Sequence, residues 1–309
     1  MGQQLWATNS LGGFLGNTHL SQKIRHAAQP MMKFRQFVDA EPAAGRSRGD
    51  TILFDKISNI STAGGTLSET DTIPKRNFTV RQGSLVVTEY GNSVPFTLKV
   101  QTLAEIEVPE NIKVVLRNDM AKVLDSAAAT QFKAEKYKAV ASTTASTVFT
   151  TNGTATATAT ANMSDKNARD VIDQLKKLNV PRYDGQDYMC IASTNSIRGL
   201  YDFFESKVQY TSMAPIYSGE IGTYYGCRFV EETNVLSNVL GNGTQYGEAV
   251  FFGADFVREG IVIPENIRID IPKDFGRDQG IAWYALTGFV LTWNFLTDGE
   301  TRGIHLTSA

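Results

Sequence analysis

The stretch VPENIKVVLRNDMAKVLDSAAATQFKAEKY, residues 108–137, has the clearest helical pattern in the sequence. Its apolar side chains recur at steps of three and four residues, the spacing that puts them on one face of an α-helix. Pro109 suits a first helical turn, and Glu110 lies near its positive end. About 30 residues at about 1.5 Å each predict a rod of about 45 Å, whereas an average helix has about 11 or 12 residues. We therefore expect a spine that spans the molecule.

Two alternating segments precede this helix. Residues 51–57 (TILFDKI) are a strand candidate, and residues 77–90 alternate apolar and polar side chains again. Residues 61–66, which include Gly64 and Gly65, predict a flexible tip between them. The pattern is that of a long β-hairpin with both faces partly polar. Because such a hairpin is marginal alone, we expect it to pack on its own body or on a neighbouring molecule.

Residues 1–50 predict an arm. Glycines punctuate residues 11–16 (LGGFLG), which therefore cannot hold a long helix. The basic residues of this stretch are Arg25, His26, Lys33, Arg35, Arg46 and Arg48. Their charge is either solvated on a loosely packed terminus or carried by an arm that lies on neighbours, and the residues leave both interpretations open.

The segment after the helix predicts a second hairpin and then a mixed α/β region. Residues 146–151 and 154–159 flank Asn152-Gly153, the preferred two-residue hairpin turn; a disordered Thr-Ala linker is the alternative. Ser164 is the predicted N-cap of a helix that ends before Pro181. Residues 188–192 predict a buried strand, and Ser193 or Thr194 the cap of a second helix through Phe204.

Strands dominate the C-terminal part of the chain. We expect them within residues 219–230, where a glycine-rich stretch turns into a strand, and at residues 249–252 and 261–271. The aromatic run from Gly280 to Phe295 predicts one long strand or a bent pair, because its β-branched and aromatic content disfavours a helix.

Composition places the chain among ordinary globular proteins. It has 309 residues, of which 42% are hydrophobic and 20% charged, and we expect two lobes with extended parts. The net charge of −2 argues against a dedicated nucleic-acid coat, which would be strongly basic. Cys190 and Cys227 have apolar or aromatic neighbours, which favours two buried thiols over a disulfide. No signal peptide and no apolar run of about 20 residues is present, so we expect a cytoplasmic site of synthesis.

No motif of an active site is present. His19 and His26 fall in the predicted arm and His305 near the C-terminus, so no histidine is expected to have an orienting scaffold. The sequence lacks a zinc-binding Cys/His cluster, a nucleophile elbow and a phosphate-binding loop. Two carboxylates could still meet in space, as in glycosidases. We nevertheless expect no enzyme, no cofactor and no metal.

The order of these segments resembles the Hong Kong 97-type coat proteins of tailed bacteriophages. Three local stretches carry the resemblance, together with their order and spacing. They are residues 219–234, which are similar to a glycine-rich axial-domain segment; residues 248–255, similar to the strand and turn that follow; and residues 276–283, similar to the lead into the last strand. These stretches suggest the N-four-like coat subfamily, and the resemblance covers nearly the whole chain.

The resemblance implies an α+β capsid fold with five parts. They are an N-terminal arm (1–50), an extended β-hairpin loop (51–98), a peripheral domain with spine helix and hairpin (99–163), an axial α/β domain (164–275), and a closing strand of the peripheral domain with the C-terminal tail (276–309). It also implies a structural virion protein that self-assembles into hexamers and pentamers of an icosahedral head around double-stranded DNA. Copies of itself, portal and scaffolding proteins, and packaged DNA in non-specific contact are the implied partners.

Nine residues are candidate assembly contacts: Gly64, Gly65, Lys56, Lys75, Arg25, Arg35, Gly219, Gly222 and Gly226. The two lysines are expected to be solvated, so no covalent crosslink is predicted. Glycines 219, 222 and 226 either let the axial segment bend differently in five-fold and six-fold rings or form plain tight turns.

Three rival functions remain. A tail-tube or decoration protein is usually β-rich and lacks a spine of about 30 residues. A polysaccharide-acting protein would expose its aromatic residues, whereas here they cluster inside predicted strands. Encapsulin-like cellular shells share the fold, and only the family resemblance separates them from a phage coat.

Overall fold

The computed structural model describes residues 26–42, 51–58, 60, 64–104, 106–155, 159–206 (203–206 as backbone), 222–236, 247–272, 274–294 and 300–308. Among them the chain forms two compact units, as its length and composition predicted. Unit 1 contains residues 26–30, 89–124 and 263–286, and unit 2 contains residues 31–88, 125–262 and 287–308.

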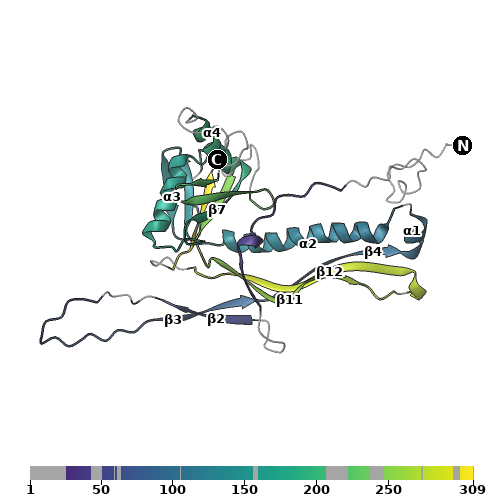
Figure 1. Cartoon of the computed structure of the whole chain (residues 1–309), viewed down its shortest axis with the longest axis horizontal. Coiled ribbons are helices and arrows are strands. Elements are labelled where there is room, and N and C mark those ends of the chain that lie inside the picture. The colour runs from purple at the N-terminus through teal and green to yellow at the C-terminus, as the bar shows by residue number, and fades with distance from the viewer. Residues whose placement is uncertain are drawn as a thin grey trace. The chain divides into compact units, whose positions relative to one another are not determined.

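The spine helix is present as α2, Val108–Lys133, the long rod in Figure 1. Its 26 residues correspond to about 39 Å. The expected end near Tyr137 was wrong by four residues. Glu135 Oε1 accepts hydrogen bonds from the backbone N–H groups of Lys136 and Tyr137, and Lys138 Nζ donates to the Lys133 carbonyl oxygen. These side chains take the backbone groups that another helical turn would need.

Unit 1 packs the first part of α2 against a sheet. The strands come from a four-stranded sheet with the order β1 (Asp39–Pro42), β11 (Val257–Ile269), β12 (Asp278–Leu291) and β4 (Thr88–Thr97). Its core contains Leu116 on α2 and Ile281, Trp283 and Ala285 on β12. The Trp283 indole N–H donates to Asp119 Oδ2 at 2.9 Å, so this buried side chain is also satisfied. A short helix, α1 (Leu98–Leu103), precedes α2, and a 3-10 turn, η3 (Asp274–Gly276), joins β11 to β12.

The sequence left the last aromatic run as one long strand or a bent pair. In the structure this run forms one continuous strand, β12. The strand predicted at 261–271 is β11, which begins four residues earlier and ends two earlier.

Unit 2 contains a seven-stranded mixed sheet. The strand order is β6 (Ser146–Thr150), β5 (Lys138–Thr143), β13 (Gly303–Ser308), β10 (Gly247–Phe252), β7 (Tyr188–Ser193), β9 (Cys227–Glu232) and β8 (Thr223–Tyr224). Two helices belong to this unit, α3 (Asp165–Lys177) and α4 (Thr194–Ser206). Two strands, β2 (Thr51–Ile57) and β3 (Val80–Val86), form a separate antiparallel ribbon, and η1 (Arg35–Phe37) precedes β1.

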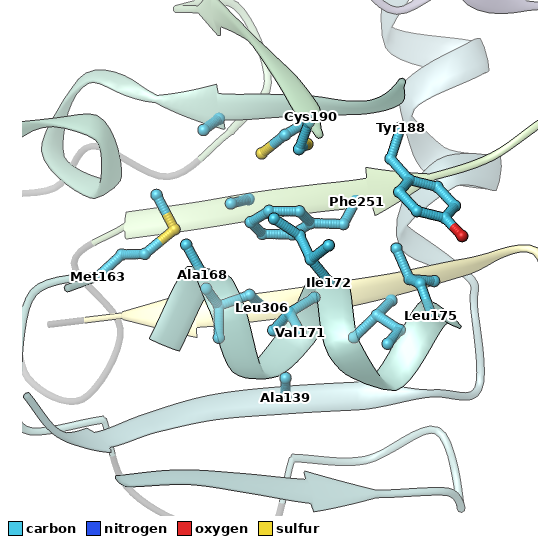
Figure 2. Packing of buried hydrophobic residues seen from close by; sticks show 14 of the residues in the cluster. Ala139, Met163, Ala168, Val171, Ile172, Leu175, Tyr188, Cys190, Phe251 and Leu306 are labelled. Atoms are coloured by element: carbon cyan, nitrogen blue, oxygen red, sulfur yellow. The ribbon is translucent and has the colours of Figure 1, made fainter. Parts of the chain in front are cut away.

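The core of unit 2 lies between α3 and the sheet. Figure 2 shows the apolar face of α3 turned toward side chains of β7, β10 and β13. The α3 residues on this face are Ala168, Val171, Ile172 and Leu175, all fully buried. Cys190 and Cys227 are free and buried among the same residues, which confirms the expectation of two buried thiols. Burial raises the pKa of Cys190, so this thiol stays protonated.

The second predicted hairpin was wrong in its pairing. β6 pairs with β5 through a turn at Thr144 and Ala145, and Asn152-Gly153 instead forms a turn after β6. The physical reason is burial: β5 contributes the buried run Ala139-Val140-Ala141. The Thr-Ala repeat at 154–159, of which residues 156–158 lie outside the described part, offers no comparable apolar face.

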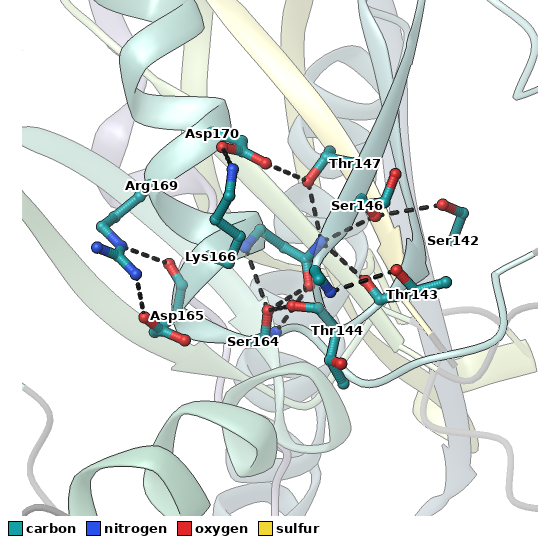
Figure 3. A network of polar contacts seen from close by, with 12 residues as sticks. Ser142, Thr143, Thr144, Ser146, Thr147, Ser164, Asp165, Lys166, Arg169 and Asp170 are labelled. Atoms are coloured by element: carbon teal, nitrogen blue, oxygen red, sulfur yellow. Dashed lines mark hydrogen bonds and ion pairs between the residues drawn. The ribbon is translucent and has the colours of Figure 1, made fainter.

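Asn167, a buried side chain on α3, joins this β5–β6 hairpin to the helix. Figure 3 shows residues of the network, among them Ser164, Thr143 and Thr147. The predicted N-cap, Ser164, forms a capping box with Asn167, whose side-chain oxygen accepts from the Ser164 backbone N–H. The Asn167 amide nitrogen donates to the carbonyl oxygens of Thr143 and Ser146 and to Thr147 Oγ1. The helix ends at Lys177, and left-handed Asn179 (φ 52°) follows it before Pro181 is reached.

We predict that Asn167→Ala lowers the free energy of unfolding by about 2–3 kcal/mol, because it leaves several buried polar groups without partners. Urea denaturation of the purified subunit, followed by circular dichroism, measures the change. The matched control is Asn152→Ala, at an exposed turn position, which we expect to cost less than about 0.5 kcal/mol. Equal effects of the two substitutions would contradict this account of the network.

Candidate assembly surfaces

The β2–β3 ribbon has one face open to solvent. The two strands pair from Thr51↔Val86 to Ile57↔Val80, so alternate side chains lie on opposite faces. On the open face Leu53, Ile57, Val80 and Val86 are each more than half exposed. These four residues, called here the ribbon stripe, are apolar side chains that the described part of the chain leaves uncovered.

The opposite face of the ribbon packs on β11 and β12, and two glycines bring the segments close together. A Cβ built on Gly260 would lie 2.7 Å from Ile52 Cδ1, and one on Gly288 would lie 2.3 Å from the carbonyl oxygen of Val86. At Gly288 the close atom belongs to the backbone, so the ribbon passes over β12 only because this position lacks a side chain. At Gly260 the close atoms are the ends of the Ile52 and Leu85 side chains, which pack directly on the glycine. The base of the ribbon therefore packs on its own body, which is one of the two placements that the sequence allowed.

Lys56 lies on this seated face and corrects an expectation. Its side chain is only 8% exposed instead of solvated. The Nζ atom lies 5.1 Å from the centroid of the Phe54 ring and 5.9 Å from that of Trp293. Burial lowers the pKa of Lys56, and the neighbouring guanidinium groups of Arg258 and Arg81 lower it further against the attraction of Asp255. Lys56 thus attaches the ribbon to the rest of unit 2, and its side chain is not exposed to a neighbouring copy.

Beyond the paired strands the ribbon continues as an exposed loop. Every residue from 64 to 79 is exposed, including Gly64, Gly65 and Lys75. The tip lies farther out than predicted, at a turn in which the Asp71 N–H donates to the Ser68 carbonyl oxygen. The Ser68 N–H in turn donates to the Asp71 carboxylate at 2.8 Å, which closes the turn. Gly64 and Gly65 therefore lie on the limb that leads to the tip.

Arg35 is bound within its own chain. Its guanidinium contacts Glu259 through two nitrogens, with Nη2 2.9 Å from Oε1 and Nε 3.2 Å from the same oxygen. The Arg35 backbone N–H donates to Asp125 Oδ1, and the adjacent Phe34 ring is fully buried against Phe132. Of the two interpretations that the sequence left open, solvated charge on a loose terminus is thus wrong for Arg35. Arg25 lies outside the described residues.

Of the three candidate glycines, Gly226 lies in a tight turn. Tyr225 (φ 53°) and Gly226 (φ 79°) are the central residues of a two-residue hairpin between Tyr224 and Cys227. Positive φ at both positions is the type I′ pattern, which favours the tight-turn interpretation for Gly226. Gly222 also has positive φ, 63°, and its carbonyl oxygen accepts from the Phe229 N–H. Gly219 lies outside the described residues, and a bending role for these glycines stays a prediction.

His305 corrects the expectation that no histidine has a scaffold. It lies in β13, buried in the sheet, with Nδ1 3.1 Å from Lys138 Nζ and Nε2 3.6 Å from Glu248 Oε1. Because an ammonium group only donates, Nδ1 is the acceptor and the imidazole is neutral. Burial lowers the pKa of His305, which is consistent with that state. The ring is closed off from solvent, so it supports the fold and does not provide an open catalytic base.

The C-terminal end of α2 contacts the same cluster. Lys133 Nζ lies 2.6 Å from Glu248 Oε2. Burial alone would raise the pKa of Glu248, but its contacts with His305 and Lys133 lower that pKa to about 2. Glu135, two residues beyond the helix, is fully buried and its Oε2 atom has no hydrogen-bond partner. Burial raises the pKa of Glu135 to about 7.

We predict that Glu135→Gln stabilises the subunit at alkaline pH. A carboxyl whose folded-state pKa is raised binds its proton more tightly in the folded state, so stability falls as pH rises from about 4.5 to about 7. The substitution should add about 3 kcal/mol at pH 8 and nothing near pH 4.5. Chemical denaturation across this range measures it. Glu248→Gln is the contrast: it should destabilise equally from pH 5 to pH 8. A pH-independent effect of Glu135→Gln would contradict the prediction.

We also predict that Gly288→Ala destabilises the subunit by about 2–3 kcal/mol, because the new methyl group meets the Val86 backbone, which cannot move without lifting the ribbon. Gly64→Ala is the control, since a Cβ there has no atom within 4 Å. Thermal unfolding of both variants against the unmodified chain tests this. Limited proteolysis should cut the ribbon faster in Gly288→Ala alone, and identical digestion patterns would refute the seating.

Other kinds of site find no support in the described residues. No group of three or more His, Cys, Asp or Glu side chains among them could hold a metal ion. None of the helices in this part of the chain is long and apolar enough to cross a membrane.

The comparisons with known proteins point to one fold. No protein-family model matches the sequence, and neither does any curated protein sequence. Solved structures match over nearly their whole length. The acidic stable capsid of Helicobacter pylori bacteriophage KHP30 has a TM-score of 0.70 at 12% identity, covering 94% of this chain and 95% of that one.

Two further matches agree. A structure from Mycobacterium phage Che8 has a TM-score of 0.67 at 14% identity, with 93% and 95% coverage. The capsid of Ralstonia phage GP4 has a TM-score of 0.66 at 13% identity, with 97% and 98% coverage. The α+β fold of tailed-phage capsid proteins, expected from the order of the segments, is confirmed. The N-four-like subfamily stays a prediction.

Proposed function

We propose that this chain is the major capsid protein of a tailed bacteriophage, which self-assembles into the hexamers and pentamers of an icosahedral head. The observation that carries the proposal is the match to phage capsids over more than nine tenths of both chains. A match of that extent includes the extended parts, which a shared core alone would not require. The virion capsid is therefore the proposed location, with assembly in the cytoplasm of the host cell.

The ribbon stripe gives a physical reason for assembly. Four apolar side chains on one face of a two-stranded ribbon are unfavourable in water, at about 25 cal/mol for each Å² of apolar surface. A neighbouring copy can cover them, and a shell repeats this contact many times. Each contact can then be modest while the sum over the shell is large.

The five parts expected from the resemblance are the proposed domain organisation, with one refinement. Residues 31–42 are part of unit 2, so the proposed arm does not include them. We further propose that the chain has no catalytic role, since its one described buried histidine cluster is closed to solvent. Portal protein, scaffolding protein and packaged DNA are proposed partners, and the net charge of −2 favours weak, non-specific contact with DNA.

Negative-stain imaging of the purified protein tests the proposal directly. The expected result is closed shells of uniform diameter or their ring-shaped capsomers. A compact monomer at high concentration, together with the absence of shells from infected cells, would overturn it. Rods or fibres would instead favour a tail-tube protein, although such a protein usually lacks a helix as long as α2.

We predict that shortening the exposed loop blocks closure of the shell but not folding. Deleting residues 65–73 removes the turn at Ser68–Asp71 without touching β2 or β3. The subunit should unfold at an unchanged temperature, since every deleted residue is exposed, and shell yield by sedimentation should fall at least about tenfold, a loss of about 1.4 kcal/mol or more.

A second variant separates the effect of loop length from that of the apolar side chains on the loop. Leu67→Ser combined with Ile73→Ser keeps the loop length but removes two exposed apolar side chains. Gly64→Ala is the neutral control. If the shortened chain assembles normally, the loop is not a tether between copies.

A further inference from the structure

The short joint between α2 and β5 contains a buried carboxyl group. The joint is residues 134–137, which connect the last residue of α2 to the first residue of β5. Glu135 is fully buried within it. Its Oε1 atom accepts hydrogen bonds from the backbone N–H groups of Lys136, at 2.9 Å, and of Tyr137, at 3.3 Å. The carboxyl group thus fixes the turn by which the chain leaves the helix.

The second oxygen of this carboxyl group has no donor. Oε2 of Glu135 is buried and lacks a hydrogen-bond partner among the described residues. An ionised carboxylate is costly in such a place, because no donor replaces the water that it loses on burial. A protonated carboxyl group is neutral and costs much less. Burial accordingly raises the pKa of Glu135 from its ordinary value of 4.5 to about 7, so the group changes charge close to neutral pH.

The nearby ammonium groups are held by other partners. Lys138 Nζ donates to the carbonyl oxygen of Lys133 at 2.6 Å and to His305 Nδ1 at 3.1 Å. Lys133 Nζ lies 2.6 Å from a carboxylate oxygen of Glu248. The neighbouring lysine charges lower the pKa of Glu135 but do not outweigh its burial. The ionisable groups around the joint are Lys133 on α2, Lys136 in the joint, Lys138 on β5, Glu248 on β10 and His305 on β13.

Backbone contacts hold the joint against two other segments. The Tyr137 carbonyl oxygen accepts from the His305 N–H at 3.1 Å, which ties the joint to β13. The Lys136 carbonyl oxygen accepts from the Gly153 N–H at 2.9 Å, at the turn after β6. The pairing of β5 with both neighbouring strands begins only at Lys138. The joint is therefore a small unit that can open while the sheet stays paired.

We propose that the joint is a proton-dependent switch, which is closed at the end of α2 while Glu135 carries a proton and opens when Glu135 is ionised. On opening, the carboxylate reaches water and releases the N–H groups of Lys136 and Tyr137. The switch resides in the single subunit. The proposal therefore goes beyond the proposed capsid function and can be tested without assembly.

The direction of the pH effect follows from where the proton binds more tightly. In the closed joint the pKa of Glu135 is about 7, whereas in the open joint, exposed to water, it returns toward 4.5. Between these values opening releases a proton, so the equilibrium constant for opening rises by up to about tenfold for each pH unit. Above about pH 7 Glu135 is ionised in both states and the rise ends. The closed joint is thus most stable in acidic solution.

Hydrogen exchange of the free subunit tests the switch. Mass spectrometry follows the backbone amides of residues 134–138, with exchange rates corrected for the intrinsic rate at each pH. In the unmodified chain we expect the opening constant to rise at least about tenfold from about pH 5 to about pH 7.5. Glu135→Gln, which stays neutral at every pH and keeps an acceptor oxygen, should show no rise. Glu110→Gln, at an exposed position of α2, is the matched control and should rise like the unmodified chain.

Three results would overturn the proposal. Exchange of the joint that stays constant over this pH range excludes the switch, and this measurement needs no variant. An equal rise in Glu135→Gln would assign the pH dependence to another group. An equal rise in the amides of α3 would indicate global unfolding instead of a local opening. Whether the chain forms shells has no bearing on these measurements, so the switch and the proposed function fail separately.

Discussion

A two-stranded ribbon buries too little surface to hold its own shape, and this constraint governs much of unit 2. The ribbon is stable at its base because Gly260 and Gly288 let it lie directly on β11 and β12. Across the ribbon, the Phe54 ring covers Gly83, its cross-strand partner. The outer face has no such support in the described residues and carries the ribbon stripe. The ribbon is thus packed against its own chain on one face and left uncovered by the described residues on the other.

Buried charges hold the surrounding segments in place. Arg35 on Glu259, Lys133 on Glu248 and Lys56 between aromatic rings each attach a segment that is distant in sequence. Breaking such a buried pair is costly, because it leaves one charge uncompensated in a medium of low dielectric constant. These contacts therefore serve less as a net gain in stability than as a means of fixing where the N-terminal segment, the helix end and the ribbon lie.

The exposed apolar surface of the ribbon suits the proposed role in a shell. The ribbon stripe is left uncovered by the described residues of the chain. A proposed shell subunit must stay soluble before assembly, and the small size of this surface satisfies that condition. In the proposed shell, repetition over many copies would supply the stability that no single contact has.

Local pattern determined much of this protein from the sequence alone. The spacing in α2, the apolar stripe of α3 with its Ser164 cap, and the β-branched run of β12 each follow from the residues within one element. The order of these elements also sufficed to indicate the capsid fold. Such features depend on neighbours one to four residues away, which a sequence displays directly.

Only the tertiary structure decided which segments meet. The choice of β5 as the partner of β6, the burial of Lys56 and the enclosure of His305 all depend on residues far away in the chain. The pairing of Arg35 could not be predicted either. The sequence left Arg35 as either a solvated charge or a contact to a neighbouring copy, because Glu259 lies 224 positions later and no local pattern indicates the pair. The periodicity of a segment indicates which face of a helix or strand is buried. The energy of a buried charge depends instead on the groups that pack against it from distant segments.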